Sequence, residues 1–325
     1  MRFQFRPYHR PFNKPLQTHH GLWSARDGFV VRLEDENGRA GWGEIAPLEA
    51  FGSENLEQAC KFCQNLPDKI TPEQIWQIPE SLPACQFGFE SAWEMMQTQN
   101  LPCSGSGYES LLCSYLLPTG KPALEAWQAA WKAGYRTFKW KIGVAPCAQE
   151  LELLEQLVTE LPVGARLRLD ANGGLDWDTA CQWLKCCDRP SIAPKVEFLE
   201  QPLAAKQFDQ MYKLSQQFQT PIALDESVSS IADLIACYRG GWRSIFVIKA
   251  AIAGSPRQLR EFCQGHALDV VWSSVFETAI ARRYIEQYLI PVCSATKRAI
   301  GFGVDQWFQP DCLMQSDFEQ LWQSL

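Results

Sequence analysis

The chain has 325 residues, 46% hydrophobic and 21% charged, which is ordinary for a globular protein with room for one large domain and a smaller one. Its net charge is −7 without clustered basic residues, which argues against nucleic-acid binding, and its 13 cysteines, an odd number, suit a reducing cytoplasm. No apolar run reaches the roughly 18 residues of a membrane span, and the N-terminus lacks a signal peptide's apolar core, so we expect a cytoplasmic protein with no membrane partner.

The first ~100 residues read as strands followed by helices. Residues 1 to 45 alternate between polar and apolar types, with a turn at Asn37-Gly38 that is a strong hairpin signal. Helical patterns follow over residues 55–64 and 72–99. This order of elements predicts an α+β domain that is distinct from the rest of the chain.

After residue 101 the pattern changes to short apolar runs that alternate with amphipathic helices, which predicts a parallel sheet built from βαβ units. The predicted strands are SLLCSYLL, TFKWKIG, RLRLDA, VEFLEQP, PIALDES, SIFVIKA and LDVVWSS, with a weaker eighth over residues 299–304. So many consecutive units favour a closed α/β barrel of the TIM type over an open sheet. A helical end follows residue 305.

Polar or ionisable residues stand at or near the C-terminal end of each predicted strand after the first, where a barrel carries its active site. In chain order they are Lys139 and Lys141, Asp170, Glu200, Asp225, Lys249, and Ser273 with Ser274. Because they are one βα unit apart, we expect them to form a ring around one mouth of the barrel.

Each of these residues also has a structural explanation by itself. A lone carboxylate after a strand is often a helix N-cap, and a lysine near a strand end usually extends to water. Three carboxylates on consecutive strands, however, repel one another in a low-dielectric mouth unless a cation compensates them. Oxygen ligands suit a hard ion, so the sequence predicts Mg²⁺ on Asp170, Glu200 and Asp225.

The lysines predict the chemistry next to that metal. Lys139 and Lys141 are two apart in a strand and therefore point to the same side. Two ammonium groups beside each other and beside a metal disfavour the charged form, so a lysine there can act as a base. Lys249 would approach from the opposite side. This arrangement is typical of proton abstraction next to a carboxylate, with the metal stabilising the enediolate.

Five segments in this order and spacing, KWK at 139–141, LDAN at 169–172, FLEQP at 198–202, ALDES at 223–227 and VIK at 247–249, resemble the muconate-lactonizing branch of the enolase superfamily. The resemblance implies a (β/α)7β barrel over residues 104–304 and an N-terminal α+β capping domain over residues 1–103. Residues 305–325 would form a C-terminal segment that packs back on the cap.

Within the superfamily, the segment around residues 26–59, the RLRLDAN run and SSVFETAIA are most similar to the o-succinylbenzoate synthase family. That family dehydrates 2-succinyl-6-hydroxy-2,4-cyclohexadiene-1-carboxylate to 2-succinylbenzoate on the route to menaquinone or phylloquinone. The similarity implies that Lys141 abstracts the proton and then protonates the leaving hydroxyl, while Lys249 stabilises the enediolate. Cap residues near 19–26 and near 51–52 would close over the site.

The expected substrate contacts are less strongly marked. Arg168 should face inward with Asp170 and would pair with a substrate carboxylate or support the metal ligands, although a structural ion pair explains it equally well. Asn172 of the LDAN motif is a further candidate. Ser273 and Ser274 would hydrogen-bond the succinyl carboxylate. Residues 290–303 match the family pattern only loosely.

Two alternatives stay open at this point. An N-succinylamino acid racemase or dipeptide epimerase of the same superfamily would use the same metal and lysines. A barrel that only binds small acids would be expected to lack one of the catalytic residues, and none is missing. The sequence does not predict the oligomeric state, and its expected partner is a small carboxylate substrate.

Overall fold

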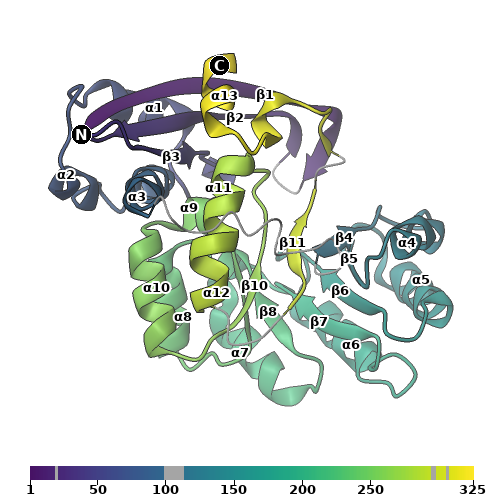
Figure 1. The fold of residues 1–325 in the computed structure, drawn as a ribbon. Coiled ribbons are helices and arrows are strands. Elements are labelled where there is room, and N and C mark those ends of the chain that lie inside the picture. The colour runs from purple at the N-terminus through teal and green to yellow at the C-terminus, as the bar shows by residue number, and fades with distance from the viewer. Residues whose placement is uncertain (19–20, 99–112, 294–297, 305–306) are drawn as a thin grey trace.

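The computed structural model describes residues 1–18, 21–98, 113–293, 298–304 and 307–325. Two parts of the chain lie against each other (Figure 1): an N-terminal sheet with its helices, and a barrel of parallel strands surrounded by helices. In the described residues, no helix is both long and apolar enough to cross a membrane.

The N-terminal sheet has three antiparallel strands, β1 (Arg2–Thr18), β2 (Gly21–Glu34) and β3 (Ala40–Ile45). The turn between β2 and β3 contains Gly38, whose φ of 77° is the left-handed conformation that glycine adopts without strain. The predicted hairpin at Asn37-Gly38 is therefore confirmed.

Helices α1 (Leu56–Gln64), α2 (Pro72–Trp76) and α3 (Pro83–Gln97) complete this part of the fold. The single helical pattern expected over residues 72–99 is wrong, because the chain leaves the helix after α2 and restarts at α3. Pro79 and Pro83 explain the break, since proline cannot donate the backbone hydrogen bond of a helix interior. Helix α3 packs closely on β3, where Gly41 and Gly43 meet its backbone without room for a Cβ atom.

The eight parallel strands of the barrel carry the predicted apolar runs. They are β4 (Cys113–Leu116), β5 (Thr137–Lys141), β6 (Arg166–Asp170), β7 (Val196–Glu200), β8 (Ile222–Leu224), β9 (Ile245–Ile248), β10 (Asp269–Trp272) and β11 (Ile300–Gly303). Their order is β10-β9-β8-β7-β6-β5-β4-β11, and a parallel bridge between Ser273 and Gly301 joins the two ends. The predicted TIM-type barrel, including its eighth strand, is confirmed.

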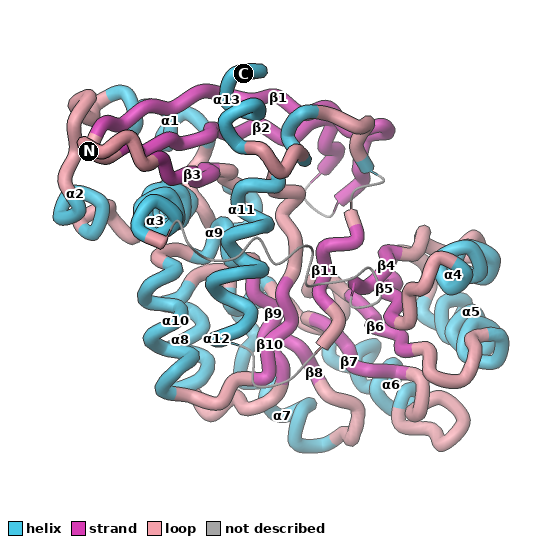
Figure 2. Tube along the Cα trace, in the orientation of Figure 1, coloured by secondary structure: helices cyan, strands magenta, loops and turns pink. Residues whose placement is uncertain are grey.

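Helices follow the strands and cover the barrel from outside, as the cyan and magenta tubes of Figure 2 show. The α-helices are α4 (Ala123–Lys132), α5 (Cys147–Glu160), α6 (Trp177–Cys187), α7 (Phe208–Gln217), α8 (Ile231–Arg239), α9 (Ala250–Ala253), α10 (Pro256–Gly265), α11 (Ala279–Tyr284) and α12 (Ile290–Cys293). Short 3-10 or π segments are η1 (Glu49–Phe51), η3 (Ala205–Gln207), η4 (Glu226–Val228), η5 (Ile285–Leu289) and η7 (Cys312–Met314).

The last helix, α13 (Phe318–Ser324), lies against the N-terminal sheet (Figure 1). Trp322 packs with Trp42 of β3 at a ring-centroid distance of 5.7 Å, and Arg6 of β1 donates to the Trp322 carbonyl. The boundaries expected between residues 103 and 104 and after residue 304 lie at or within segments outside the described residues.

Candidate active site

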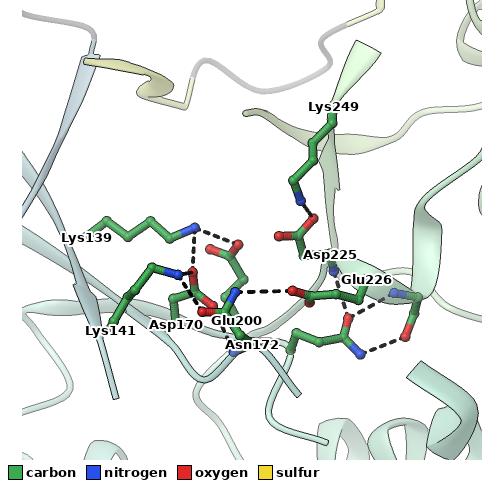
Figure 3. Close-up of polar contacts among 10 residues, drawn as sticks. Lys139, Lys141, Asp170, Asn172, Glu200, Asp225, Glu226 and Lys249 are labelled. Atoms are coloured by element: carbon green, nitrogen blue, oxygen red, sulfur yellow. Dashed lines mark hydrogen bonds and ion pairs between the residues drawn. The ribbon is translucent and has the colours of Figure 1, made fainter. Parts of the chain in front are cut away.

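The charged residues predicted to form a ring meet at one mouth of the barrel (Figure 3). Lys141, Asp170 and Glu200 are the last residues of β5, β6 and β7, and Asp225 and Lys249 directly follow β8 and β9. Neighbouring parallel strands are in register here, with Lys141 opposite Asp170 and Asp170 opposite Glu200. This register is why residues far apart in sequence converge.

Lys139 lies between two of the carboxylates. Its Nζ is 2.8 Å from Asp170 Oδ2 and 2.8 Å from Glu200 Oε1. Burial lowers the pKa of Lys139, but attraction to Asp170, Glu200 and Asp225 outweighs burial and the pKa ends above its ordinary value. These three carboxylates therefore favour the ammonium form of Lys139.

The pKa values of Glu200 and Asp170 are shifted in opposite directions. Burial raises the pKa of Glu200, and repulsion from Asp170 adds to it, so that the pKa is about 8. Burial also acts on Asp170, but Lys139 and Lys141 outweigh it and hold the pKa of Asp170 below its usual range. Burial and repulsion therefore disfavour the ionised form of Glu200, which additional positive charge would favour.

The donor set fits a divalent cation. Asp170, Glu200 and Asp225 are almost fully buried and offer oxygen atoms, which hard ions prefer. In the described part of the chain no three carboxylate, imidazole or thiol groups yet enclose a common point. Ammonium groups contact these carboxylates: Lys139 bridges Asp170 and Glu200, and Lys249 contacts Asp225. Ion binding would replace these ammonium contacts.

Lys141 and Lys249 approach from opposite sides, as Figure 3 shows. Lys141 donates to Asn172 Oδ1, and its Nζ lies 3.6 Å from Asp170 Oδ2. Lys249 contacts Asp225 and lies 4.7 Å from the centre of the Phe51 ring. The two amines could thus act on opposite faces of one bound molecule.

Two residues near the carboxylates were not identified from the sequence, although both belong to quoted motifs. Glu226 accepts from Asn172 Nδ2 at 3.1 Å, which orients the amide oxygen toward Lys141, and burial followed by repulsion from Asp225 raises its pKa to about 7. Gln201 accepts from the backbone N–H of Asp225 at 2.9 Å and so holds that loop. Their roles depend on partners that no local pattern reveals.

A cavity of about 140 Å³ opens at this mouth. Eight of the predicted site residues line it: Lys139, Lys141, Asp170, Asn172, Asp225, Lys249, Ser273 and Ser274. Trp23, Phe51 and Phe276 form an aromatic wall, and the first two come from the N-terminal part of the chain. Both fall in or beside the segments expected to close over the site, whereas His19 lies outside the described residues.

Arg168 does not reach this cavity. In β6 and β7, Leu167 lies opposite Val196 but Arg168 opposite Phe198, so Glu197 is skipped and accepts from Arg168 Nε at 2.7 Å. Arg298 donates to the same carboxylate. We therefore correct the substrate-binding interpretation of Arg168 in favour of the structural ion pair that explained it equally well.

The serines line the cavity, but two of their polar groups are engaged. Ser274 donates its hydroxyl to Glu277 Oε2 at 3.0 Å, and the Ser274 Oγ atom itself accepts from the Phe276 N–H at 2.9 Å. The backbone N–H of Ser273 donates to Ile248. A substrate oxygen that accepts from a serine hydroxyl would use Ser273, or would displace Glu277 from Ser274.

Comparison with known proteins now identifies the family. A family model described as MenC, N-terminal domain matches residues 2–96, and one described as Enolase C-terminal domain-like matches residues 123–299. An o-succinylbenzoate synthase from Thermosynechococcus vestitus is 43% identical over 100% of this chain and 99% of the relative. The chain belongs to the o-succinylbenzoate synthase family. Among members of that family, the synthase of Photorhabdus laumondii is 30% identical over 78% of this chain and 75% of its own.

Solved structures agree with this o-succinylbenzoate synthase membership. The crystal structure of the synthase from Thermosynechococcus elongatus BP-1, complexed with Mg in the active site, superposes with a TM-score of 0.91 at 42% identity and covers 100% of both chains. The L-Ala-D/L-Glu epimerase from Bacillus subtilis has a TM-score of 0.78 at 18% identity, covering 96% of this chain and 92% of the epimerase, and it supports the fold alone. The chain is thus an enzyme of the enolase superfamily.

Proposed function

We propose that this enzyme dehydrates 2-succinyl-6-hydroxy-2,4-cyclohexadiene-1-carboxylate to 2-succinylbenzoate, a step toward menaquinone or phylloquinone. The observation that carries the proposal is the full-length 43% identity to a synthase of that name. The two lysines on opposite sides of a carboxylate cluster supply chemistry that suits the reaction.

Asp170, Glu200 and Asp225 are the residues we propose to hold Mg²⁺. Support comes from their burial, from the raised pKa of Glu200 and from the metal present in the related crystal structure. A bound Mg²⁺ would neutralise the substrate carboxylate and stabilise the negative charge that develops on it.

Lys141 is the proposed base and acid. Its neutral amine would take the proton from the ring carbon that bears the carboxylate, and its ammonium would return that proton to the departing hydroxyl at the neighbouring carbon. One water molecule leaves and the ring becomes aromatic. Asn172, oriented by Glu226, would keep the Lys141 amine directed into the cavity.

The other two lysines would remain cationic. Lys249, on the opposite side, would stabilise the enediolate as an ammonium group, and its position beside Phe51 keeps it at the cavity wall. Lys139, which contacts Asp170 and Glu200 here and would give up these contacts to Mg²⁺, would contribute positive charge near the substrate carboxylate. Neither role requires a proton to leave the lysine.

Ser273 and Ser274 are proposed to bind the succinyl carboxylate, because both line the cavity on the side of β10. A carboxylate would accept from the Ser273 hydroxyl and compete with Glu277 for Ser274. We also propose a cytoplasmic location, supported by seven buried cysteines that are free thiols: Cys63, Cys85, Cys186, Cys187, Cys237, Cys263 and Cys293.

The direct test is a spectroscopic assay of the purified protein with the cyclohexadiene substrate, in Mg²⁺ and in EDTA. Metal-dependent aromatisation is the expected result. A folded protein that binds Mg²⁺ but does not turn this substrate over would contradict the proposal. N-succinylamino acids and dipeptides would then be tested, because lysines on opposite faces are also the arrangement that a racemase or epimerase needs.

A further inference from the structure

Arg26, on strand β2, is buried with only 3% of its surface exposed. Among the described residues, its hydrogen-bond acceptors are all backbone carbonyl oxygens. Nε donates to Val275 at 2.9 Å, Nη1 to Pro47 at 2.7 Å and to Asp27 at 3.2 Å, and Nη2 to Ala46. One guanidinium group therefore joins its own strand to two separate loops, one from each part of the fold.

Both loops carry cavity residues. Val275 stands between Ser274 and Phe276, which line the cavity from the barrel side. Ala46 and Pro47 precede η1, whose last residue, Phe51, lines the cavity from the cap side. Arg26 itself is not a lining residue, so it acts behind the wall rather than in it.

The aromatic wall residues are also in contact with one another. Trp23, three residues before Arg26 on β2, has its ring 6.0 Å from Phe51 and 6.5 Å from Phe276. Phe276 has a φ of 63°, a left-handed conformation that is unfavourable for a bulky residue and persists only where the surroundings impose it. The hydrogen bond from Arg26 to Val275 restrains the residue directly before it.

We propose that Arg26 is a positioning residue for substrate binding, which holds Trp23, Phe51 and Phe276 in one arrangement around the cavity. The planar guanidinium fork can donate to three segments at once, whereas a lysine ammonium is a compact group at the end of a flexible stem and cannot span them. Without the guanidinium group, the two loops that line the cavity would be held less firmly. The positions of Lys141, Lys249 and the carboxylates, which the barrel strands fix, would not change. Arg26 should therefore affect KM far more than kcat.

The test compares Arg26→Lys with Arg260→Lys. Arg260 on α10 is also an arginine at the contact between the two parts, where it pairs with Glu94 of α3 and donates to Tyr284 at 2.8 Å, but it does not line the cavity. Steady-state kinetics, melting temperature and calorimetric Mg²⁺ affinity are measured for both variants and the wild type. We expect both to melt lower, and only Arg26→Lys to raise KM, at least tenfold, with kcat within threefold and Mg²⁺ affinity unchanged.

Equal KM values for the two variants would overturn the proposal and leave Arg26 with a purely structural role. If Arg26→Lys does not fold, Arg26→Gln replaces it, and a wild-type KM in that variant would contradict the proposal equally. The role of Arg26 rests on the proposed dehydration, which supplies the substrate, but the experiment distinguishes the failure of one from the failure of the other. A wild type without turnover rejects the proposed function, whereas an active wild type with an unaltered Arg26→Lys KM rejects the role of Arg26.

Discussion

Thr278, at the start of barrel helix α11, donates its backbone N–H and its hydroxyl to Glu44 of cap strand β3, at 2.8 and 2.5 Å. Tyr8 of β1 donates to the other carboxylate oxygen. A buried carboxylate of the N-terminal sheet therefore accepts hydrogen bonds from the N-terminus of a barrel helix. That helix directly follows the loop that carries Ser274 and Phe276. Burial raises the pKa of Glu44, and the hydrogen bonds from Thr278 and Tyr8 offset burial only in part.

This raised pKa predicts a pH-dependent stability. The folded protein holds the Glu44 proton more tightly than the unfolded chain, whose glutamates titrate near about 4.3. The stabilisation is complete below that pH and is lost as the pH rises through the folded-state pKa. Glu44→Gln stays neutral, so its melting temperature relative to the wild type should increase between pH 4.5 and 8. A difference that is constant with pH would contradict this assignment.

Lys141→Ala should lose nearly all dehydration, because it removes the proposed base that takes the ring proton and returns it to the leaving hydroxyl. General acid–base groups typically contribute roughly 10²–10⁴-fold in rate. Lys141 is partly exposed in the mouth, so circular dichroism and melting temperature should stay close to those of the wild type. Turnover near the wild-type rate would exclude Lys141 as the base.

Asp225→Asn should weaken Mg²⁺ binding at least about tenfold, since an amide oxygen replaces one of the three proposed anionic ligands. Isothermal titration calorimetry measures the affinity. The matched control is Asp188→Asn, because Asp188 accepts from Gln219 and Thr220 before β8 and not from any residue of the cluster. If both variants bind Mg²⁺ as the wild type does, the metal site lies elsewhere.

Phe51→Ala should lower kcat/KM by roughly 2- to 30-fold, the range that a cation–π contact of about 0.5–2 kcal/mol predicts. Its ring lies against Lys249, and Phe51 lines both the active-site cavity and a second cavity of about 250 Å³. Phe51→Leu keeps most of the volume without the aromatic face, so it distinguishes the contact from the filling of space. An unchanged kcat/KM in both variants would show that Phe51 has no role in catalysis.

The sequence by itself determined the parallel barrel and the ring of charged residues at its mouth. Both follow from local rules: apolar runs alternate with helices, and residues that end successive parallel strands meet at one edge. Lys141, Asp170, Glu200, Asp225 and Lys249 could therefore be identified by counting along the chain.

Only the tertiary structure decided what those residues and their neighbours contact. The alternation of side chains along a strand correctly predicted that Arg168 points inward. Its pairing with Glu197, however, depends on the register shift between β6 and β7. The contacts of Glu44 with Thr278 and of Arg26 with Val275 join residues 234 and 249 positions apart. Such pairs arise because the N-terminal part of the chain packs against the barrel, and no periodicity within either segment encodes which side chain faces the other.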